Sequence, residues 1–184
     1  PIEQLKQEII DMGQIPELIL VAQDLTRYGI DLYGKPSLVK LLQELSSMEQ
    51  VEKIRLLYCY PDMIDNELIE EIRNNDKIIK YIDMPLQHAD RSTLKRMNRR
   101  GDGESYLKII EKLKTIKGMV IRSTFIAGFP GESEQAFENL VEFIKKAKFF
   151  NAGFFAYSRE EGTPSYSFDG QIPEKVKKQR VKKL

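Results

Sequence analysis

The residues best suited to chemistry stand where five apolar runs of the sequence end. Each run is typical of a buried β-strand. Parallel α/β folds bind their ligands at the carboxyl ends of the strands. Amides, a carboxylate, a guanidinium and hydroxyls at such ends predict a cradle for a small polar ligand rather than a complete catalytic machine. The candidates are Gln23, Asp24, Tyr58, Tyr60, Gln87, His88, Arg122, Thr124, Ile126, Gly128, Tyr157 and Ser158.

Several kinds of site are disfavoured by what the sequence lacks. His88 is the only histidine and Cys59 the only cysteine, so a catalytic zinc site, a disulfide framework and a multi-cysteine metal site within this chain are not expected. Neither a serine nucleophile elbow nor a Walker-type phosphate loop is present. Cys59 lies in an apolar run and is predicted to be a small buried hydrophobe.

The stretch from Arg122 to Glu132 predicts a strand that ends in a glycine turn and opens a helix. Gly128, Pro130 and Gly131 interrupt the apolar pattern, and Ser133 can cap the helix that follows. Two interpretations remain open. The glycines let a ligand approach the backbone, or they only make a tight strand–helix connection.

Alternation along this strand places Arg122, Thr124, Ile126 and Gly128 on one face. A buried arginine requires an anionic partner. A carboxylate of a substrate or cofactor would serve, and so would Asp24 or Asp83.

The elements that position these residues alternate along the chain. A helix is predicted over residues 2–12, strands over 18–22, 54–60, 78–84, 119–127 and 151–157, and a helix after each strand, with residues 25–35 as a long loop. Strands separated by helices pair in parallel with right-handed crossovers. A full eight-stranded barrel needs ~250 residues. The 184 residues therefore predict an α/β fold, either part of a barrel or an open sheet.

Composition indicates an ordinary globular protein, with 41% hydrophobic and 31% charged residues. No stretch approaches the ~20 apolar residues of a membrane span, and a net charge of +1 gives no field that favours nucleic acid. The last residues are rich in lysine and predict a solvated helix. A cytoplasmic location is expected.

Four segments resemble the methylthiotransferases of the radical S-adenosylmethionine (SAM) superfamily: Leu20–Asp31, Tyr81–Ala89, Arg122–Glu132 and Tyr157–Pro164. Lys95–Arg100 fits as well. Ala22-Gln23-Asp24 with the loop after it resembles the branch that modifies an aspartate of a small-subunit ribosomal protein. The tRNA-modifying relatives usually carry another sequence there, which argues against that branch. A tRNA methylthiotransferase core is the alternative.

The resemblance implies a partial parallel (β/α) barrel, with SAM across its strand ends and bound to a four-iron four-sulfur (4Fe-4S) cluster. It implies that a radical made from SAM takes hydrogen from the substrate. Gln23 and Asp24 would hold the methionine amino group of SAM, Arg122 its carboxylate, and Ile126 and Gly128 the adenine. Gln87 would face the ribose or substrate, and Thr124 and Tyr157 complete the expected cofactor contacts.

The family carries its cluster on a Cys-x-x-x-Cys-x-x-Cys loop, which would precede Pro1. We therefore expect residues 1–170 to be a truncated core with about five strands, the first strand missing, and residues 171–184 to lead as a basic helix toward a missing C-terminal domain. No metal ligand and no catalytic residue is expected in this chain, which alone should be inactive.

The expected partner is a small-subunit ribosomal protein, with neither a membrane nor direct contact to nucleic acid. A further alternative is a non-catalytic fragment that binds a protein through Arg91–Arg100 and the lysine-rich end.

Overall fold

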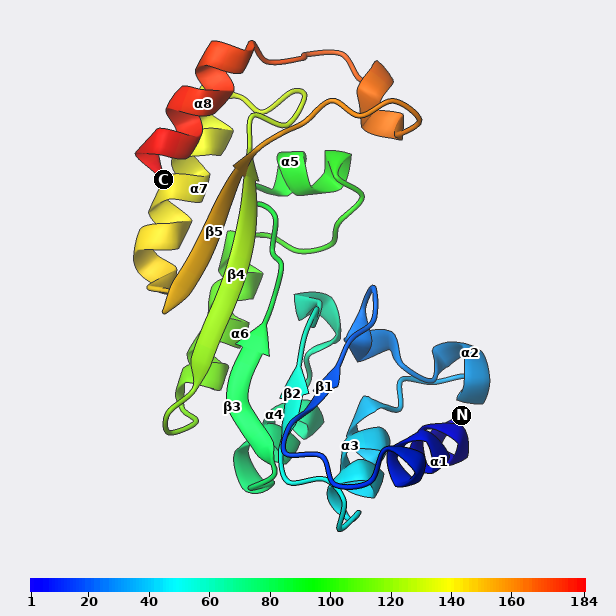
Figure 1. The fold of residues 1–184 in the computed structure, drawn as a ribbon. Coiled ribbons are helices and arrows are strands. Elements are labelled where there is room, and N and C mark those ends of the chain that lie inside the picture. Colours follow the sequence, from blue (N-terminus) through cyan, green and yellow to red (C-terminus); the bar gives the residue numbers. More distant parts are fainter. The chain divides into compact units, whose positions relative to one another are not determined.

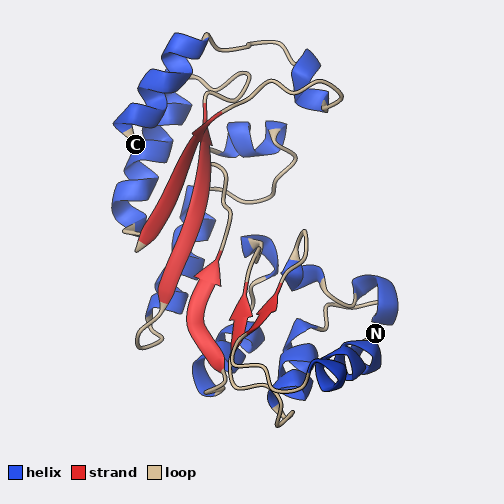
Figure 2. Ribbon diagram, in the orientation of Figure 1, coloured by secondary structure: helices blue, strands red, loops and turns tan.

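The computed structural model describes residues 1–184, in which helices and strands alternate (Figures 1 and 2). Short 3₁₀ turns cover Leu25–Arg27, Pro61–Met63 and Pro164–Ser167. The strands are β1 (Leu18–Leu20), β2 (Ile54–Leu56), β3 (Ile78–Asp83), β4 (Val120–Ala127) and β5 (Asn151–Ala156). The helices are α1 (Ile2–Met12), α2 (Ile30–Tyr33), α3 (Leu38–Ser46), α4 (Asn66–Asn74), α5 (Arg91–Arg96), α6 (Gly103–Lys114), α7 (Glu134–Ala147) and α8 (Glu174–Lys183).

The five strands follow one another in the sheet in chain order, β1-β2-β3-β4-β5. The described pairs are all parallel, which confirms the predicted α/β class and its five strands. The chain divides into two compact units. The first holds residues 1–84 and 112–121, and the second holds residues 85–111 and 122–184.

In the first unit, β2 lies between β1 and β3, with Leu18 opposite Ile54 and Ile54 opposite Ile78. Apolar residues at helical spacing on α3 and α4 are buried and form the core with β2. Asp65 accepts a hydrogen bond from the N–H of Leu68 at 2.9 Å and caps α4, as predicted. The core residues of α3, α4 and β2 are Leu41, Leu42, Leu45, Ile54, Leu56 and Ile72.

The long loop predicted for residues 25–35 was wrong in part, because it contains a 3₁₀ turn and α2. Asp24 caps the 3₁₀ turn by accepting from the N–H of Thr26. Gly29 and Gly34 adopt φ of 89° and 71°, a backbone region that glycine enters without strain, and they bound the single turn of α2.

In the second unit, β4 and β5 pair from Arg122 opposite Asn151 to Ala127 opposite Ala156. Along β4 the buried and half-buried residues alternate, which confirms that Arg122, Thr124 and Ile126 share one face. The opposite face carries Phe125, whose ring contacts those of Phe143 on α7, Phe149 and Phe154, with centroids 6.1, 5.5 and 5.9 Å away.

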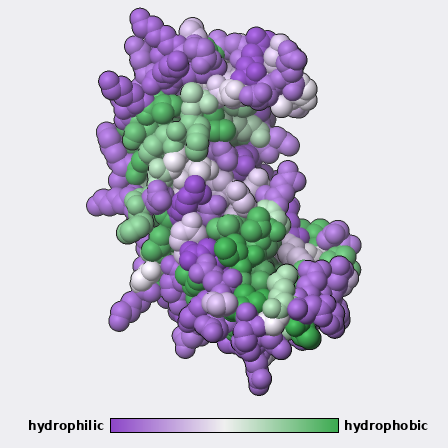
Figure 3. Space-filling view, in the orientation of Figure 1, coloured by the Kyte–Doolittle hydropathy of each residue, from purple (hydrophilic) through white to green (hydrophobic).

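Apolar side chains are also exposed on the strands of both units, and Figure 3 shows hydrophobic surface within each unit. In the first unit, Ile19 of β1 and Val21 just after it are 50% and 61% exposed. In the second unit, Phe155 of β5 is 56% exposed. Each unit thus exposes at least one large apolar side chain on or just after a strand.

Helix α8 corrects the expectation of a solvated lysine-rich helix. Lys177 and Arg180 are only 2% and 8% exposed. Val181 and Leu184 pack on a core cluster of Ala127 and two α7 residues, so α8 is held within the second unit. Only part of the α8 surface is exposed to solvent as the composition predicted, and its exposed lysines are Lys175, Lys178, Lys182 and Lys183.

Replacing Ser133 by alanine should lower the free energy of unfolding by about 1 kcal/mol, because the N–H of Ala136 loses the Ser133 Oγ acceptor, 3.1 Å away. Ser133 is exposed, so no cavity forms. Urea unfolding measures the loss, with Gln135→Ala in the same helical turn as the control. Equal effects of the two substitutions would show that the cap contributes nothing.

Candidate functional site

The segment after β3 places Gln87 in an unusual backbone conformation. Its φ is +68°, a region that residues other than glycine seldom enter. The Gln87 N–H donates to the carbonyl of Thr124, and the Ile126 N–H donates to the carbonyl of Gln87, both at 2.8 Å. The His88 N–H reaches the Leu86 carbonyl at 2.8 Å and closes a three-residue turn. Strain of this kind persists where neighbours enforce it, and it gathers at functional sites.

Gln87 and Ile126 line a cavity of about 450 Å³ in the second unit. Its walls combine the aromatic rings of Phe129 and Phe168 with two guanidinium groups, and no acidic side chain lines it. A cavity with apolar walls and a few fixed polar groups suits a small ligand that is part apolar and part polar. The lining residues are Gln87, Arg96, Met97, Asn98, Arg99, Ile126, Phe129, Pro164, Ser165 and Phe168.

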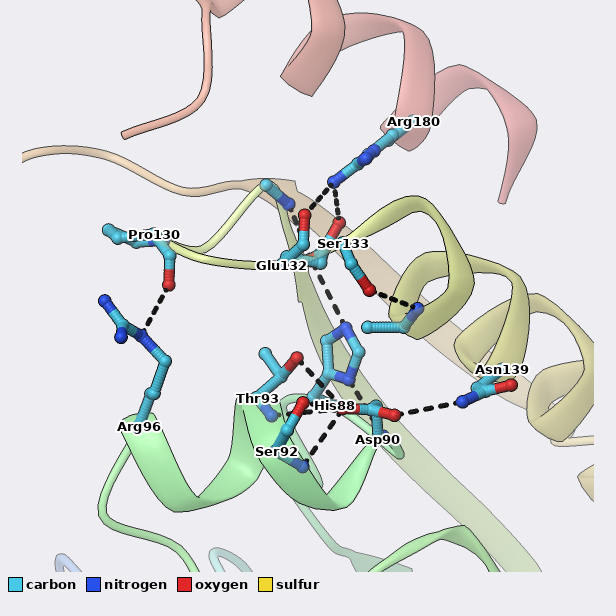
Figure 4. Close-up of polar contacts among 12 residues, drawn as sticks. His88, Asp90, Ser92, Thr93, Arg96, Pro130, Glu132, Ser133, Asn139 and Arg180 are labelled. Atoms are coloured by element: carbon cyan, nitrogen blue, oxygen red, sulfur yellow. Dashed lines mark hydrogen bonds and ion pairs between the residues drawn. The ribbon is translucent and has the colours of Figure 1, made fainter. Parts of the chain in front are cut away.

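A fully buried carboxylate, Glu132, lies beside the turn after β4 (Figure 4). Its Oε2 accepts from the N–H of Gly128 at 2.9 Å and from Nε2 of His88 at 3.2 Å. Its Oε1 accepts from Nη1 of Arg180 at 2.6 Å, and the same nitrogen donates to the Glu132 carbonyl at 3.1 Å. Three donors from separate segments thereby compensate for the cost of burying this charge.

The hydrogen bonds of His88 define its tautomer. The N–H of Asp90 donates to its Nδ1 at 2.9 Å, so Nδ1 carries a lone pair and the proton sits on Nε2, from which it donates to Glu132. Both ring nitrogens of this buried histidine are therefore in use. His88 thus links the backbone of Asp90 to the carboxylate of Glu132.

Gly128 is explained by packing. Its φ is +80°, and a Cβ built on it would lie 2.4 Å from Cγ of Lys177. Gly131, with φ of +82°, would meet Nε of Arg96 at 2.9 Å. These contacts support the interpretation of a tight strand–helix connection, and a direct contact of Gly128 with a cofactor stays a prediction.

Contrary to the sequence prediction, the other predicted residues of this unit do not all lie at carboxyl strand ends. Arg122 lies near the amino end of β4, opposite the first residue of β5, and Thr124 lies in the middle of the strand. Arg122 and Thr124 are half-buried on the face of β4 that carries Ile126. Tyr157 follows β5, and its ring meets that of Phe129 edge-on at 5.1 Å. The Tyr157 hydroxyl is buried without a hydrogen-bond partner, which is costly unless a ligand completes it.

Gln23 and Asp24 lie in the first unit, directly after β1. Asp24 already holds structure, since its Oδ2 accepts from Nε of Arg27 at 2.9 Å, and Arg27 continues to Asp62. Gln23 is exposed and lines a separate opening with Asp24 and Tyr28. Burial and the neighbouring Tyr33 raise the pKa of Tyr28 to about 12, so this hydroxyl stays protonated.

No group of three or more histidine, cysteine or acidic side chains could hold a metal ion in the 184 residues. Cys59 is fully buried, and this burial raises the pKa of its thiol. No helix has the length and apolar character that crossing a bilayer requires.

The sequence interpretation missed Glu132 and Arg180 as part of the site. The sequence offers only two signals. Glu132 is an acid directly after a glycine turn, and Arg180 lies in a basic helix at a spacing from other residues that places them on one face. Neither signal pairs the two residues, which lie 48 positions apart.

Substitutions at Gln87 test the backbone strain. The Gln87→Gly variant should be more stable than the Gln87→Ala variant, with a free energy of unfolding about 1 kcal/mol higher. The reason is that glycine adopts φ near +68° without cost. Both variants lose the amide group and differ only by the β-carbon, so urea unfolding compares how well each residue tolerates this φ. An alanine variant as stable as the glycine variant would contradict a strained turn.

The Asp90 carboxylate caps α5, accepting from the N–H groups of Ser92 and Thr93, and it also accepts from Asn139. Burial alone would raise the pKa of Asp90, but the hydrogen bonds from Ser92, Asn139 and Thr93 outweigh it and lower the pKa to about 2.

A lowered pKa means that ionised Asp90 stabilises the fold above pH ~4, and that this contribution falls away as pH drops toward 2. Asp90→Asn keeps a capping oxygen but cannot titrate. The stability advantage of the unsubstituted protein over this variant should therefore shrink between pH 5 and pH 2 in urea unfolding. An advantage that stays constant over this range would rule out the lowered pKa.

Comparison with known proteins adds to this geometry. The sequence model of the "Radical SAM superfamily" matches residues 2–144. The ribosomal protein uS12 methylthiotransferase RimO of Caldanaerobacter subterraneus subsp. tengcongensis is 55% identical over 97% of this chain and 41% of the relative. RimO of Carboxydothermus hydrogenoformans is 50% identical over 100% of this chain and 43% of that protein. The chain thus spans about two-fifths of the length of these relatives.

Solved structures resemble the fold. Coproporphyrinogen III oxidase (HemN) of Escherichia coli aligns with a TM-score of 0.67 and 16% identity, over 97% of this chain and 42% of that chain. The radical SAM methyltransferase TsrM of Kitasatospora setae aligns with a TM-score of 0.64 and 13% identity, over 86% of this chain and 28% of its own. At such identities the likeness concerns the fold alone.

Proposed function

Because this chain belongs to the radical SAM superfamily, we propose that it is the SAM-binding core of a methylthiotransferase that modifies ribosomal protein uS12. The observation that carries this proposal is identity of 50–55% with uS12 methylthiotransferases over nearly the whole chain. The relatives are more than twice as long as this chain, so the activity is proposed for the full-length protein.

Enzymes of this superfamily use SAM and a 4Fe-4S cluster. When bound, SAM supplies the means to take a hydrogen atom from an unreactive C–H bond. The cavity of the second unit fits such a cofactor, since it offers apolar and aromatic walls beside the amide of Gln87. Tyr157, whose buried hydroxyl has no hydrogen-bond partner, does not line this cavity, but its ring packs against Phe129, which does. The residues present do not fit the cluster, because they include no set of metal ligands.

The side chains of this chain would bind and orient the cofactor. Ile126 and Phe129 give an apolar surface for a planar base, and Gln87 can donate to and accept from its polar atoms. Arg122 and Thr124, on the same face of β4 as Ile126, suit a carboxylate. Gln23 and Asp24, in the first unit, carry carbonyl and carboxylate oxygens that can accept from an amino group, and their contact with the amino group of SAM stays a prediction.

The substrate class separates this proposal from the alternatives. A uS12 methylthiotransferase acts on protein, whereas a tRNA methylthiotransferase would act on RNA, and a binding fragment would modify neither. The full-length protein carrying this chain, loaded with its cluster and reductant, should add a methylthio group to purified uS12. Mass spectrometry of uS12 and of tRNA distinguishes the three outcomes.

Shortening Ile126 tests the cofactor site within this chain. Ile126→Ala should weaken SAM binding about tenfold, the consequence of losing ~1.4 kcal/mol of apolar contact. Val120→Ala is the matched control, because Val120 lies on the same face at the other end of β4. Equilibrium dialysis of labelled SAM against the cluster-loaded full-length protein measures both. Equal affinities of the two variants would remove Ile126 from the site.

A further inference from the structure

Gln87 depends on its neighbours for its orientation. Its backbone hydrogen bonds to β4 fix the main chain on one side, and the three-residue turn to His88 fixes it on the other. His88 is in turn held by its ring, through Asp90 on one nitrogen and Glu132 on the other. The strained residue of the cavity is therefore followed directly by a side chain that is buried and hydrogen-bonded at both ring nitrogens.

Glu132 joins the segments that form the cavity wall. Through Gly128 it holds the end of β4, two residues beyond Ile126, and through His88 it holds the turn that carries Gln87. Through Arg180 it attaches both to α8 (Figure 4). Arg180 also donates to Glu134 at 2.9 Å, but the Glu134 side chain is 72% exposed and reaches neither segment.

We propose that Glu132 is a positioning residue, which acts through His88 to hold Gln87 toward the cofactor cavity. This inference rests on the proposed SAM site and assigns a residue that supports it from outside the cavity. Only a carboxylate fills the position, because two oxygens must serve three donors. A glutamine would have one acceptor oxygen and would turn an NH₂ group toward one of those donors.

A purely structural role is the competing explanation, since a buried ion pair contributes to stability wherever it lies. The two explanations differ in their coupling to Gln87. If Glu132 acts through Gln87, then removing the Gln87 side chain in a Glu132→Gln background costs no further affinity. If Glu132 only supports the fold, the two losses are independent and add.

The first experiment measures SAM affinity in the full-length, cluster-loaded protein by equilibrium dialysis, for E132Q, Q87A and the double variant. E132Q and Q87A should each weaken binding about fivefold, and the double variant should be no weaker than either. Additive losses, or an unchanged affinity of E132Q, would overturn the proposal. E134Q, which removes the exposed partner of Arg180, is the control and should stay within twofold of the unsubstituted protein.

Substitutions at His88 keep the test decisive if E132Q fails to fold. Glutamine can place an NH₂ group near the position of Nε2 and so preserve the donor to Glu132. Asparagine can place an oxygen near Nδ1 and preserve only the acceptor for Asp90. H88N should weaken SAM binding as E132Q does, and H88Q should retain binding within threefold. The reverse order would show that the link to Glu132 does not position Gln87.

Amide hydrogen exchange separates this proposal from the proposed function. If the unsubstituted protein does not bind SAM, the SAM site is wrong. Exchange at residues 86–88 should nevertheless be faster in E132Q than in E134Q, each measured at the same interval below its own thermal midpoint, if Glu132 holds this turn. Unchanged exchange there would overturn the positioning role whether or not SAM binds.

Discussion

The second unit depends on one buried negative charge. Glu132 has no exposed side-chain surface, and such a carboxylate is tolerated only when its oxygens are hydrogen-bonded and its charge is balanced. Gly128, His88 and Arg180 provide this from the end of β4, the turn after β3 and helix α8. These connections also fix where Gln87 and Ile126 lie, so the cavity and the core of this unit share one set of hydrogen bonds.

Most of the fold could be predicted from local patterns. Apolar periodicity located all five strands and the long helices, and the caps at Asp65 and Ser133 form as predicted. Alternation along β4 correctly placed Arg122, Thr124 and Ile126 on one face. These features succeed because each depends on residues a few positions apart, and backbone geometry then determines the rest.

The site could be predicted only in part, because its main contacts join distant residues. His88 and Arg180 lie 44 and 48 positions from Glu132, and no local pattern pairs them. For the same reason, the basic composition of residues 174–183 concealed two buried cations. Gln23 and Asp24 were located at a strand end as expected, and their contact with a cofactor remains a prediction.

The burial of Arg180 has a consequence for anyone who shortens this protein. A fragment that ends before residue 180 would retain Glu132 in the interior but remove the guanidinium that balances it. Removing one partner of a buried ion pair typically lowers the free energy of unfolding by ~3–5 kcal/mol, a large part of the stability of a small domain. It would also expose the apolar surface of Ala127, Phe137 and Val141 that Val181 and Leu184 cover. The smallest truncation that leaves this part of the protein soluble and folded should therefore keep α8 to its end, even though its lysines make it resemble a dispensable tail.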